Sequence, residues 1–180
     1  MEQGFVKVAS ATPRIRVADP VYNAQVICEQ AKEAAEHGAK IVVFPELCIT
    51  GYTCNDLFLQ ELLLEKAKEA LLTIAEETGQ LETLFLVGLP VDKDGRLYNV
   101  AAVLYRGRIL GMIPKKNIPM YAEFYEGRHF TPGEETVTEY RLGKQVIPFG
   151  SNLLFRCEEL PELILGCELC EDLWVAEPPS

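Results

Sequence analysis

The sequence lacks three features that would point to a membrane or a nucleic acid. No apolar run approaches the roughly 18 residues that a membrane-spanning helix requires. Basic residues are few, since 17 Lys and Arg stand against 27 Asp and Glu and leave a net charge of −10. The first residues, Met1–Phe5, lack the basic segment followed by an apolar one that marks a secretory signal. We therefore expect a cytoplasmic protein without a nucleic-acid or membrane partner.

Histidine is also scarce, and the six cysteines are irregularly spaced. His37 and His129 lie far apart in the sequence, which disfavours a metal site built with the Cys167-x-x-Cys170 pair. That pair could instead be a redox motif, but it falls in a segment that predicts a strand, where residues three apart face opposite sides. With 180 residues and 48% hydrophobic content, residues 1–180 can form one domain with a full core, so we expect free thiols and no metal.

Hydrophobic patterning predicts an α/β protein. One helix is predicted to begin after Asp19-Pro20 and to end at Gly38, and a second runs from about Asp56 to Thr78. Residues 117–150 show no clear period and predict a long ordered loop. Strands are predicted at residues 5–11, 41–44, 84–88, 98–105, 108–113, 153–156 and 163–167. The opening strand–helix–strand order implies parallel pairing with a right-handed crossover.

Three reactive side chains each follow a predicted strand. Glu46 follows the strand at 41–44, Lys115 follows the second strand of a predicted hairpin, and Cys170 follows the last strand. The carboxyl ends of strands are where α/β proteins place their sites. A carboxylate base, an ammonium and a thiol together can cleave an amide by nucleophilic attack of the thiolate on the carboxamide carbon. A helix start after Cys170 would lower the pKa of this thiol.

Each of these residues also has a purely structural interpretation. Cys170 by itself could be a buried, inert thiol, and Glu46 or either lysine could be a solvated surface charge. Lys116 competes with Lys115 for the site, because adjacent residues on an extended segment face opposite ways and only one can enter.

Residues 44–47, 114–119 and 163–174 together resemble motifs of the nitrilase (carbon–nitrogen hydrolase) superfamily, and most resemble the glutaminase domains of glutamine-dependent NAD synthetases. The resemblance implies a nitrilase-like αββα sandwich, truncated here in its C-terminal part. It also implies a catalytic triad of Glu46, Lys115 and Cys170, and it selects Lys115 over Lys116 through the flanking prolines.

The same resemblance implies a substrate pocket. Its residues would be Tyr52, Tyr121, Glu123 and Glu171. Glu123 would be a second glutamate that supports the site, and the backbone N–H of Glu171 would join the oxyanion hole.

The implied function is hydrolysis of glutamine, with ammonia passed to a synthetase domain that is absent from this chain and that uses ATP and Mg²⁺ to amidate deamido-NAD. The glutaminase half would need no cofactor, and it would form a homo-oligomer. A stand-alone amidase or nitrilase for another small amide and a non-catalytic assembly domain are the alternatives.

Overall fold

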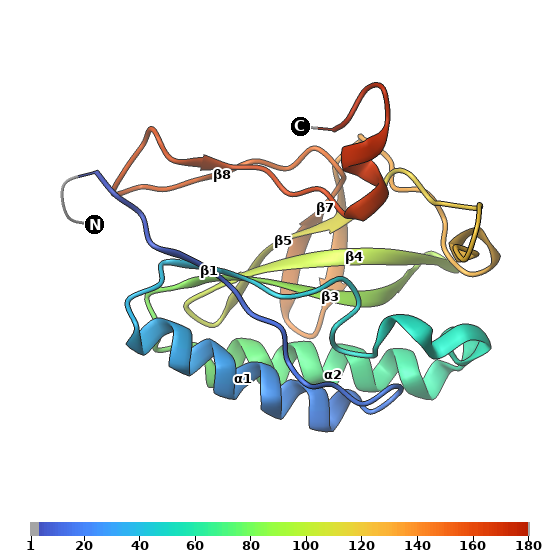
Figure 1. Cartoon of the computed structure of the whole chain (residues 1–180), viewed down its shortest axis with the longest axis horizontal. Helices are drawn as coiled ribbons and strands as arrows, with labels where there is room; N and C mark the ends of the chain where they lie inside the picture. The colour runs from blue at the N-terminus through green and yellow to red at the C-terminus, as the bar shows by residue number, and fades with distance from the viewer. Residues whose placement is uncertain (1–3, 180) are drawn as a thin grey trace.

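The computed structural model describes residues 4–179, so Met1–Gln3, part of the N-terminal stretch considered above, lie outside the described residues. A seven-stranded mixed sheet carries two helices against one face and a small two-stranded ribbon over the other (Figure 1). The strand order is β1-β2-β3-β4-β5-β7-β6. The strands of this sheet are β1 (Val8–Ser10), β2 (Ile41–Val43), β3 (Leu84–Lys93), β4 (Arg96–Tyr105), β5 (Arg108–Pro114), β6 (Thr138–Leu142) and β7 (Gln145–Phe149). The α/β prediction is confirmed.

The first helix, α1 (Pro20–Glu36), begins and ends where the sequence predicts. The Asp19 side chain accepts a hydrogen bond from the N–H of Tyr22 at 3.1 Å, and Pro20 occupies a position whose N–H needs no partner. Gly38 follows with φ +80°, a conformation that suits glycine. The helix connects β1 to β2, which pair in parallel as predicted.

The second helix begins later than predicted. Tyr52–Leu59 form 3-10 turns (η1), and the α-helix proper, α2, spans Glu61–Glu77. Asn55, with φ 51° and ψ −133°, breaks the helical path inside η1. The Asp56 carboxylate is held by Arg128 at 2.7 and 2.9 Å, so this segment follows a distant loop instead of the helix axis.

The predicted loop at 117–150 contains a β-hairpin, which corrects that prediction. Strands β6 and β7 pair antiparallel, and β7 pairs with β5, which leaves β6 at the sheet edge. Their buried side chains alternate with exposed ones, at Tyr140, Leu142, Ile147 and Phe149. The alternation is short and set among charged residues, and therefore gives a weak signal along the sequence.

The last two predicted strands are short and lie outside the main sheet. Strands β8 (Phe155–Arg156) and β9 (Ile164–Leu165) form their own antiparallel ribbon, which Figure 1 shows above the sheet face opposite the helices. A 3-10 turn, η3 (Cys170–Trp174), follows. Cys170 thus begins a short turn and does not directly follow a buried strand, contrary to the prediction.

The main core lies between the helices and the sheet, and a smaller apolar cluster lies under the β8–β9 ribbon. All six cysteines are free. Within residues 4–179, no helix combines the length and apolarity needed to cross a membrane.

Candidate active site

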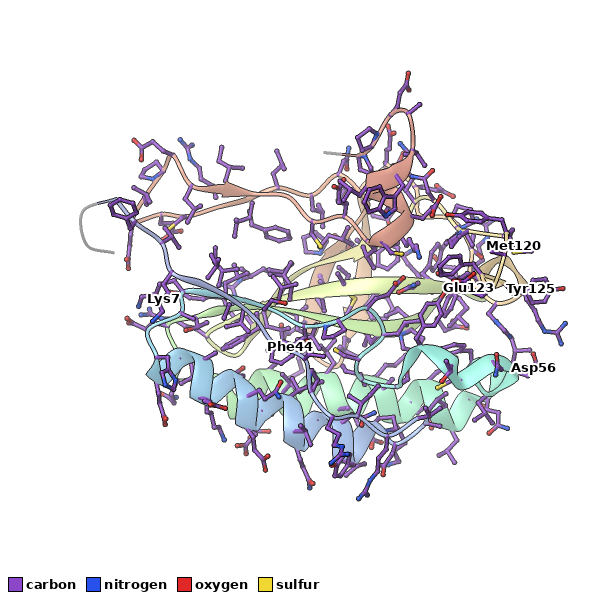
Figure 2. All side chains as sticks on the ribbon, viewed as in Figure 1. Lys7, Phe44, Asp56, Met120, Glu123 and Tyr125 are labelled. Atoms are coloured by element: carbon purple, nitrogen blue, oxygen red, sulfur yellow. The ribbon has the colours of Figure 1, made fainter. Side chains whose placement is uncertain are left out.

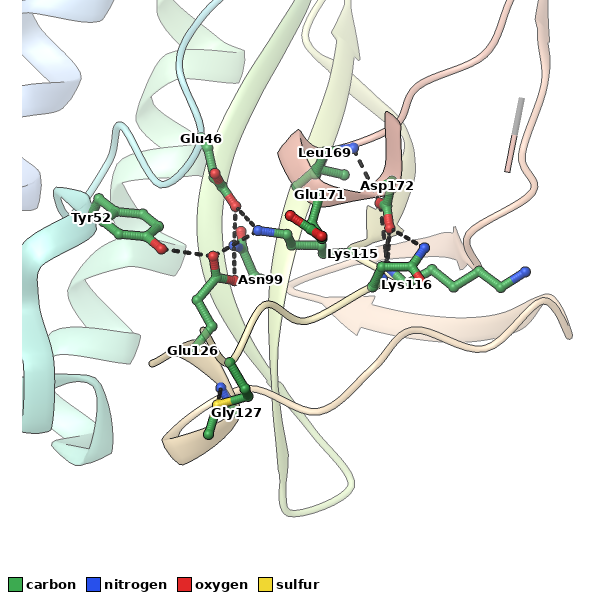
Figure 3. A network of polar contacts seen from close by, with 12 residues as sticks. Glu46, Tyr52, Asn99, Lys115, Lys116, Glu126, Gly127, Leu169, Glu171 and Asp172 are labelled. Carbon is green, nitrogen blue, oxygen red and sulfur yellow. Dashed lines mark hydrogen bonds and ion pairs between the residues drawn. The ribbon is translucent and has the colours of Figure 1, made fainter. Parts of the chain in front are cut away.

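Lys115 is a fully buried cation held between two carboxylates. It directly follows β5, and its side chain is 0% exposed. The Nζ atom donates to Glu46 Oε1 at 2.8 Å and to Glu126 Oε1 at 2.7 Å (Figure 3). Burial acts to lower the pKa of Lys115, but the hydrogen bonds and charges of Glu126 and Glu46 together outweigh it and raise this pKa. The lysine is therefore a buried ammonium whose charged form its two carboxylate partners stabilise.

Lys116 points elsewhere. Its Nζ pairs with Glu135 at 2.5 Å on the exposed side of the segment. The two adjacent lysines therefore face different partners, and the structure places Lys115 in the cluster, as the resemblance implied.

Glu46 is positioned by a tight backbone turn after β2. The N–H of Cys48 donates to the carbonyl of Pro45, and Leu47 adopts φ 52°. This turn packs directly on Gly88 of β3, where an added Cβ would lie 2.3 Å from the Leu47 nitrogen. Only glycine allows such a close approach.

Asn99 joins the two carboxylates from the middle of β4. Its side chain is 0% exposed, and its Nδ2 donates to Glu46 Oε1 at 2.6 Å and to Glu126 Oε2 at 3.4 Å. Sequence reasoning missed this residue, although a lone asparagine in an otherwise apolar strand is an available signal.

Glu126 is the second glutamate of the site. It begins the 3-10 turn η2 (Glu126–Arg128), is 4% exposed, and accepts a hydrogen bond from the Tyr52 hydroxyl at 2.7 Å. Burial, followed by the hydrogen bond and charge of Glu126, raises the pKa of Tyr52. Tyr52 thus contacts the cluster, as expected for a residue of the site.

Glu123 does not hold the position predicted for it. It is exposed, on the loop that also carries Met120 and Tyr125 (Figure 2), and among residues 4–179 no hydrogen bond joins it to the lysine. The prediction of Glu123 as the supporting glutamate is wrong because the loop turns Glu126 inward three residues later. Any contact of Glu123 with substrate stays a prediction.

Cys170 lies at the accessible edge of this cluster, at the first position of η3, and its backbone is strained at φ 46°. Burial raises the pKa of its thiol, and so do the charges of Glu46, Glu126 and Glu171, while Lys115 lowers it. The expectation of a lowered thiol pKa is therefore wrong, because burial of the thiol and the charges of the nearby carboxylates together outweigh the single ammonium. A thiol of this kind needs a base to take its proton.

Glu171 and Tyr121 contact each other beside Cys170. The Tyr121 hydroxyl donates to Glu171 Oε2 at 2.7 Å, although Tyr121 itself is 55% exposed. The hydrogen bond to Glu171 is the largest influence on Tyr121 and raises its pKa. The structure therefore brings together the predicted pocket residues Tyr121 and Glu171, next to Cys170.

Among the residues that the structure describes, no group of three or more His, Cys, Asp or Glu side chains is arranged to hold a metal ion. The chemistry available is that of a thiol, an ammonium and carboxylates within one cluster. These groups can transfer a proton from the thiol and can stabilise a negatively charged intermediate.

Comparisons with known proteins show the family of this chain. Residues 7–179 match the family described as carbon-nitrogen hydrolase. A glutamine-dependent NAD(+) synthetase of Mycobacterium tuberculosis is 40% identical over 179 residues, which are 99% of this chain and 26% of that protein. The chain therefore spans about a quarter of the length of this curated relative.

Two solved structures resemble the fold. A glutamine-dependent NAD(+) synthetase from Cytophaga hutchinsonii superposes with a TM-score of 0.85 at 29% identity, over 92% of this chain and 28% of that one. An amidase from Nesterenkonia sp. superposes with a TM-score of 0.60 at 24% identity, over 79% of this chain and 54% of that one. At this identity the amidase supports the fold alone.

Proposed function

This chain belongs to the carbon–nitrogen hydrolase family, and we propose that it is the glutaminase part of a glutamine-dependent NAD synthetase. Its substrate would be the side-chain amide of glutamine, and its products glutamate and ammonia. One observation carries the proposal: a buried ammonium, Lys115, is clamped between Glu46 and Glu126 beside an accessible thiol in a strained turn. The similarity to NAD synthetases over nearly the whole chain supports the choice of glutamine.

In the proposed reaction, Glu46 takes the proton of the Cys170 thiol as sulfur attacks the carboxamide carbon. Lys115 and the N–H of Glu171 stabilise the negative oxygen of the tetrahedral intermediate. Glu46 then gives its proton to the departing nitrogen, which leaves as ammonia, and a thioester remains on Cys170. Glu46 next takes a proton from water, and the resulting hydroxide attacks the thioester. Glu46 returns this proton to the sulfur as the C–S bond breaks, which restores the thiol and the Glu46 carboxylate and releases glutamate.

The raised pKa of the Cys170 thiol supports a base-assisted attack over a preformed thiolate. Glu126 keeps Lys115 charged and in place through the hydrogen bond that it accepts from the Lys115 ammonium. Tyr52 and Asn99 in turn hold Glu126 through the hydrogen bonds that they donate to its carboxylate. We further propose that Tyr52, Tyr121 and Glu171 line the glutamine pocket.

The larger protein is part of the same proposal. Ammonia would pass to a synthetase domain that uses ATP and Mg²⁺ to amidate deamido-NAD, and the assembly would be a cytoplasmic homo-oligomer. All steps of glutamine hydrolysis would use groups of this chain without a further cofactor.

Trapping of Cys170 tests the proposal directly. A diazoketone analogue of glutamine should form a covalent adduct on Cys170, detected by peptide mass spectrometry, and glutamine should protect against it. Cys170→Ala should abolish ammonia release in the native protein, while Cys167→Ala, a matched control, should retain it.

Substrate comparison separates the alternatives. Faster turnover of short aliphatic amides or nitriles than of glutamine would favour a stand-alone amidase. Full glutamine-dependent activity in Cys170→Ala would favour a non-catalytic domain.

A further inference from the structure

Asp172 is a buried carboxylate whose hydrogen bonds come from N–H groups alone. It is 2% exposed. Asn117 donates to Oδ1 through its backbone N–H at 2.7 Å and its side-chain Nδ2 at 2.9 Å. The backbone N–H of Lys116 lies 3.2 and 3.3 Å from the two oxygens, and that of Leu169 lies 3.2 Å from Oδ2. Such charge-assisted bonds offset the cost of burying the charge.

These bonds join two segments that carry the proposed chemistry. Lys116 and Asn117 directly follow Lys115, and Leu169 directly precedes Cys170. Figure 3 shows the side chain of Asp172 reaching from the η3 turn toward Lys116. The N–H of Asp172 also donates to the Leu169 carbonyl at 3.0 Å, which closes the turn around Cys170.

The strained backbone of Cys170 requires such support. A φ of +46° at a non-glycine residue persists only where the surrounding structure imposes it. η3 has five residues, which is too short to hold this conformation by helical hydrogen bonding. The carboxylate of Asp172 accepts hydrogen bonds from the N–H of Leu169, directly before Cys170, and from the Lys116–Asn117 backbone across the site. These bonds fix the turn that carries Cys170 against the segment that follows Lys115.

We propose that Asp172 is a positioning residue, which holds the turn of the nucleophile against the lysine segment so that the Cys170 thiol and the Lys115 ammonium address the same substrate carbonyl. Asp172 acts through the backbone and does not touch the reacting atoms. The proposal rests on the proposed function for its catalytic consequence, but not for its effect on the thiol.

The thiol offers a readout that separates positioning from charge. The groups that act on its pKa or are acted on by its charge are Glu46, Lys115, Glu126, Glu171, Tyr52 and Tyr121. Lys115 alone among these lowers the thiol pKa. Loss of positioning would move the thiol out of this cluster, and because burial and the carboxylates raise its pKa more than Lys115 lowers it, the pKa would fall toward that of a free thiol. Removal of the Asp172 charge would act in the same direction, so a variant that keeps this charge separates the two effects.

The test is Asp172→Asn in the native protein, which keeps the shape but turns one acceptor into a donor facing N–H groups. We expect kcat for glutamine to fall about 100-fold with KM changed less than about threefold. We also expect the pH profile of Cys170 alkylation by iodoacetamide, followed by peptide mass spectrometry, to shift to lower pH. Asp19→Ala, which removes a helix cap far from the site, should lower stability while leaving kcat and the alkylation profile unchanged.

A second variant covers the case in which Asp172→Asn does not fold. Asn117→Ala keeps the carboxylate and its backbone donors and should lower kcat about 10-fold with the same direction of shift. Unchanged kcat and alkylation in the folded variants, or a shift to higher pH, would overturn the proposal. If the unaltered protein does not hydrolyse glutamine, the proposed function fails, and the alkylation profiles still decide the role of Asp172.

Discussion

At the scale of single residues, the site depends on a balance of buried charges. Lys115 would be costly to bury alone, and its two carboxylate partners make the charged form stable. The two glutamates of the loop after Lys115, Glu123 and Glu126, differ in their access to the Lys115 ammonium. Glu126 is turned inward and buried, whereas Glu123 is exposed.

Exchange of these two glutamates for glutamine tests that assignment. Glu126→Gln leaves Lys115 with a single carboxylate partner, which should lower the lysine pKa and reduce kcat for glutamine about 100-fold. Glu123→Gln, the matched control, should stay within about threefold of the unaltered protein. Equal losses of kcat in the two variants, measured by ammonia release, would contradict a specific role of the buried Glu126 carboxylate.

Gly88 offers a second test at this scale. A Cβ there would meet the Leu47 nitrogen at 2.3 Å and the Pro45 carbonyl at 2.8 Å, so Gly88→Ala must displace the turn that carries Glu46. We expect loss of stability by about 2–4 kcal/mol in urea unfolding and loss of glutaminase activity in whatever protein folds.

Gly143→Ala is the control for Gly88→Ala. Gly143 has a positive φ of 57° but open space around it, so its replacement should cost about 1 kcal/mol and spare the activity. Wild-type activity in Gly88→Ala would contradict the close packing of the Glu46 turn.

At the scale of elements, local sequence signals set the bounds of α1, whereas long-range contacts set the β6–β7 hairpin and the start of α2. The cap at Asp19, the proline after it and the apolar spacing of α1 are local, and the helix was predicted within a residue or two. The β6–β7 hairpin depends on pairing with β5, and the start of α2 depends on Arg128, and neither contact shows in a local pattern.

Tyr140 provides a test of the hairpin. Burial is the main cause that raises its pKa, to about 12, so the phenol stays neutral in the folded protein while it ionises in the unfolded chain above about pH 10. The contribution of the neutral Tyr140 phenol to the free energy of unfolding is therefore complete below about pH 10 and is lost as the pH rises to about 12. Its upper limit is about 3 kcal/mol.

Tyr140→Phe lacks this titration. Its free energy of unfolding, measured by urea between about pH 8 and pH 11 under reducing conditions, should fall less with pH than that of the unaltered protein. Buried Cys28 and Cys48, whose pKa values burial raises to about 11 and about 12, titrate equally in both proteins. Identical pH slopes would contradict the burial of Tyr140.

At the scale of the whole molecule, the two faces of the sheet differ. The helices α1 and α2 cover one face, whereas the β8–β9 ribbon lies over the other (Figure 1). A groove of about 520 Å³ lies there, between residues of the ribbon such as Phe155 and Leu165 and sheet residues such as Leu84 and Leu110. Leu154 and Trp174 are 71% and 74% exposed, so their apolar side chains are available for contact with other protein.

Trp174, the single tryptophan of the chain, can report on such covering. In residues 1–180 alone, acrylamide should quench its fluorescence strongly, because the indole is 74% exposed. In a native protein of the length of the NAD synthetase relatives, we expect weaker quenching, after correction for other tryptophans by a Trp174→Phe comparison. Equal quenching in both would show that this edge stays open.

The sequence by itself determined the α/β class, the parallel opening unit, the hairpin of β4 and β5, and the identity of Glu46, Lys115 and Cys170 as candidates. These depend on periodicity, caps and short motifs, which are properties of neighbouring residues. The resemblance to the nitrilase superfamily is carried by the same short segments, and the family is confirmed.

The tertiary structure alone decided which groups meet. In the folded chain Glu126, and not Glu123, accepts the hydrogen bond of Lys115, and Asn99 donates to Glu46. Folding also brings Asp172 to the backbone of Lys116, and burial raises the pKa of the Cys170 thiol. The physical reason is that burial and charge pairing join residues far apart in the chain, such as Lys115 and Glu46, 69 positions apart. No local pattern encodes the distance between two charges or the water that folding removes from between them.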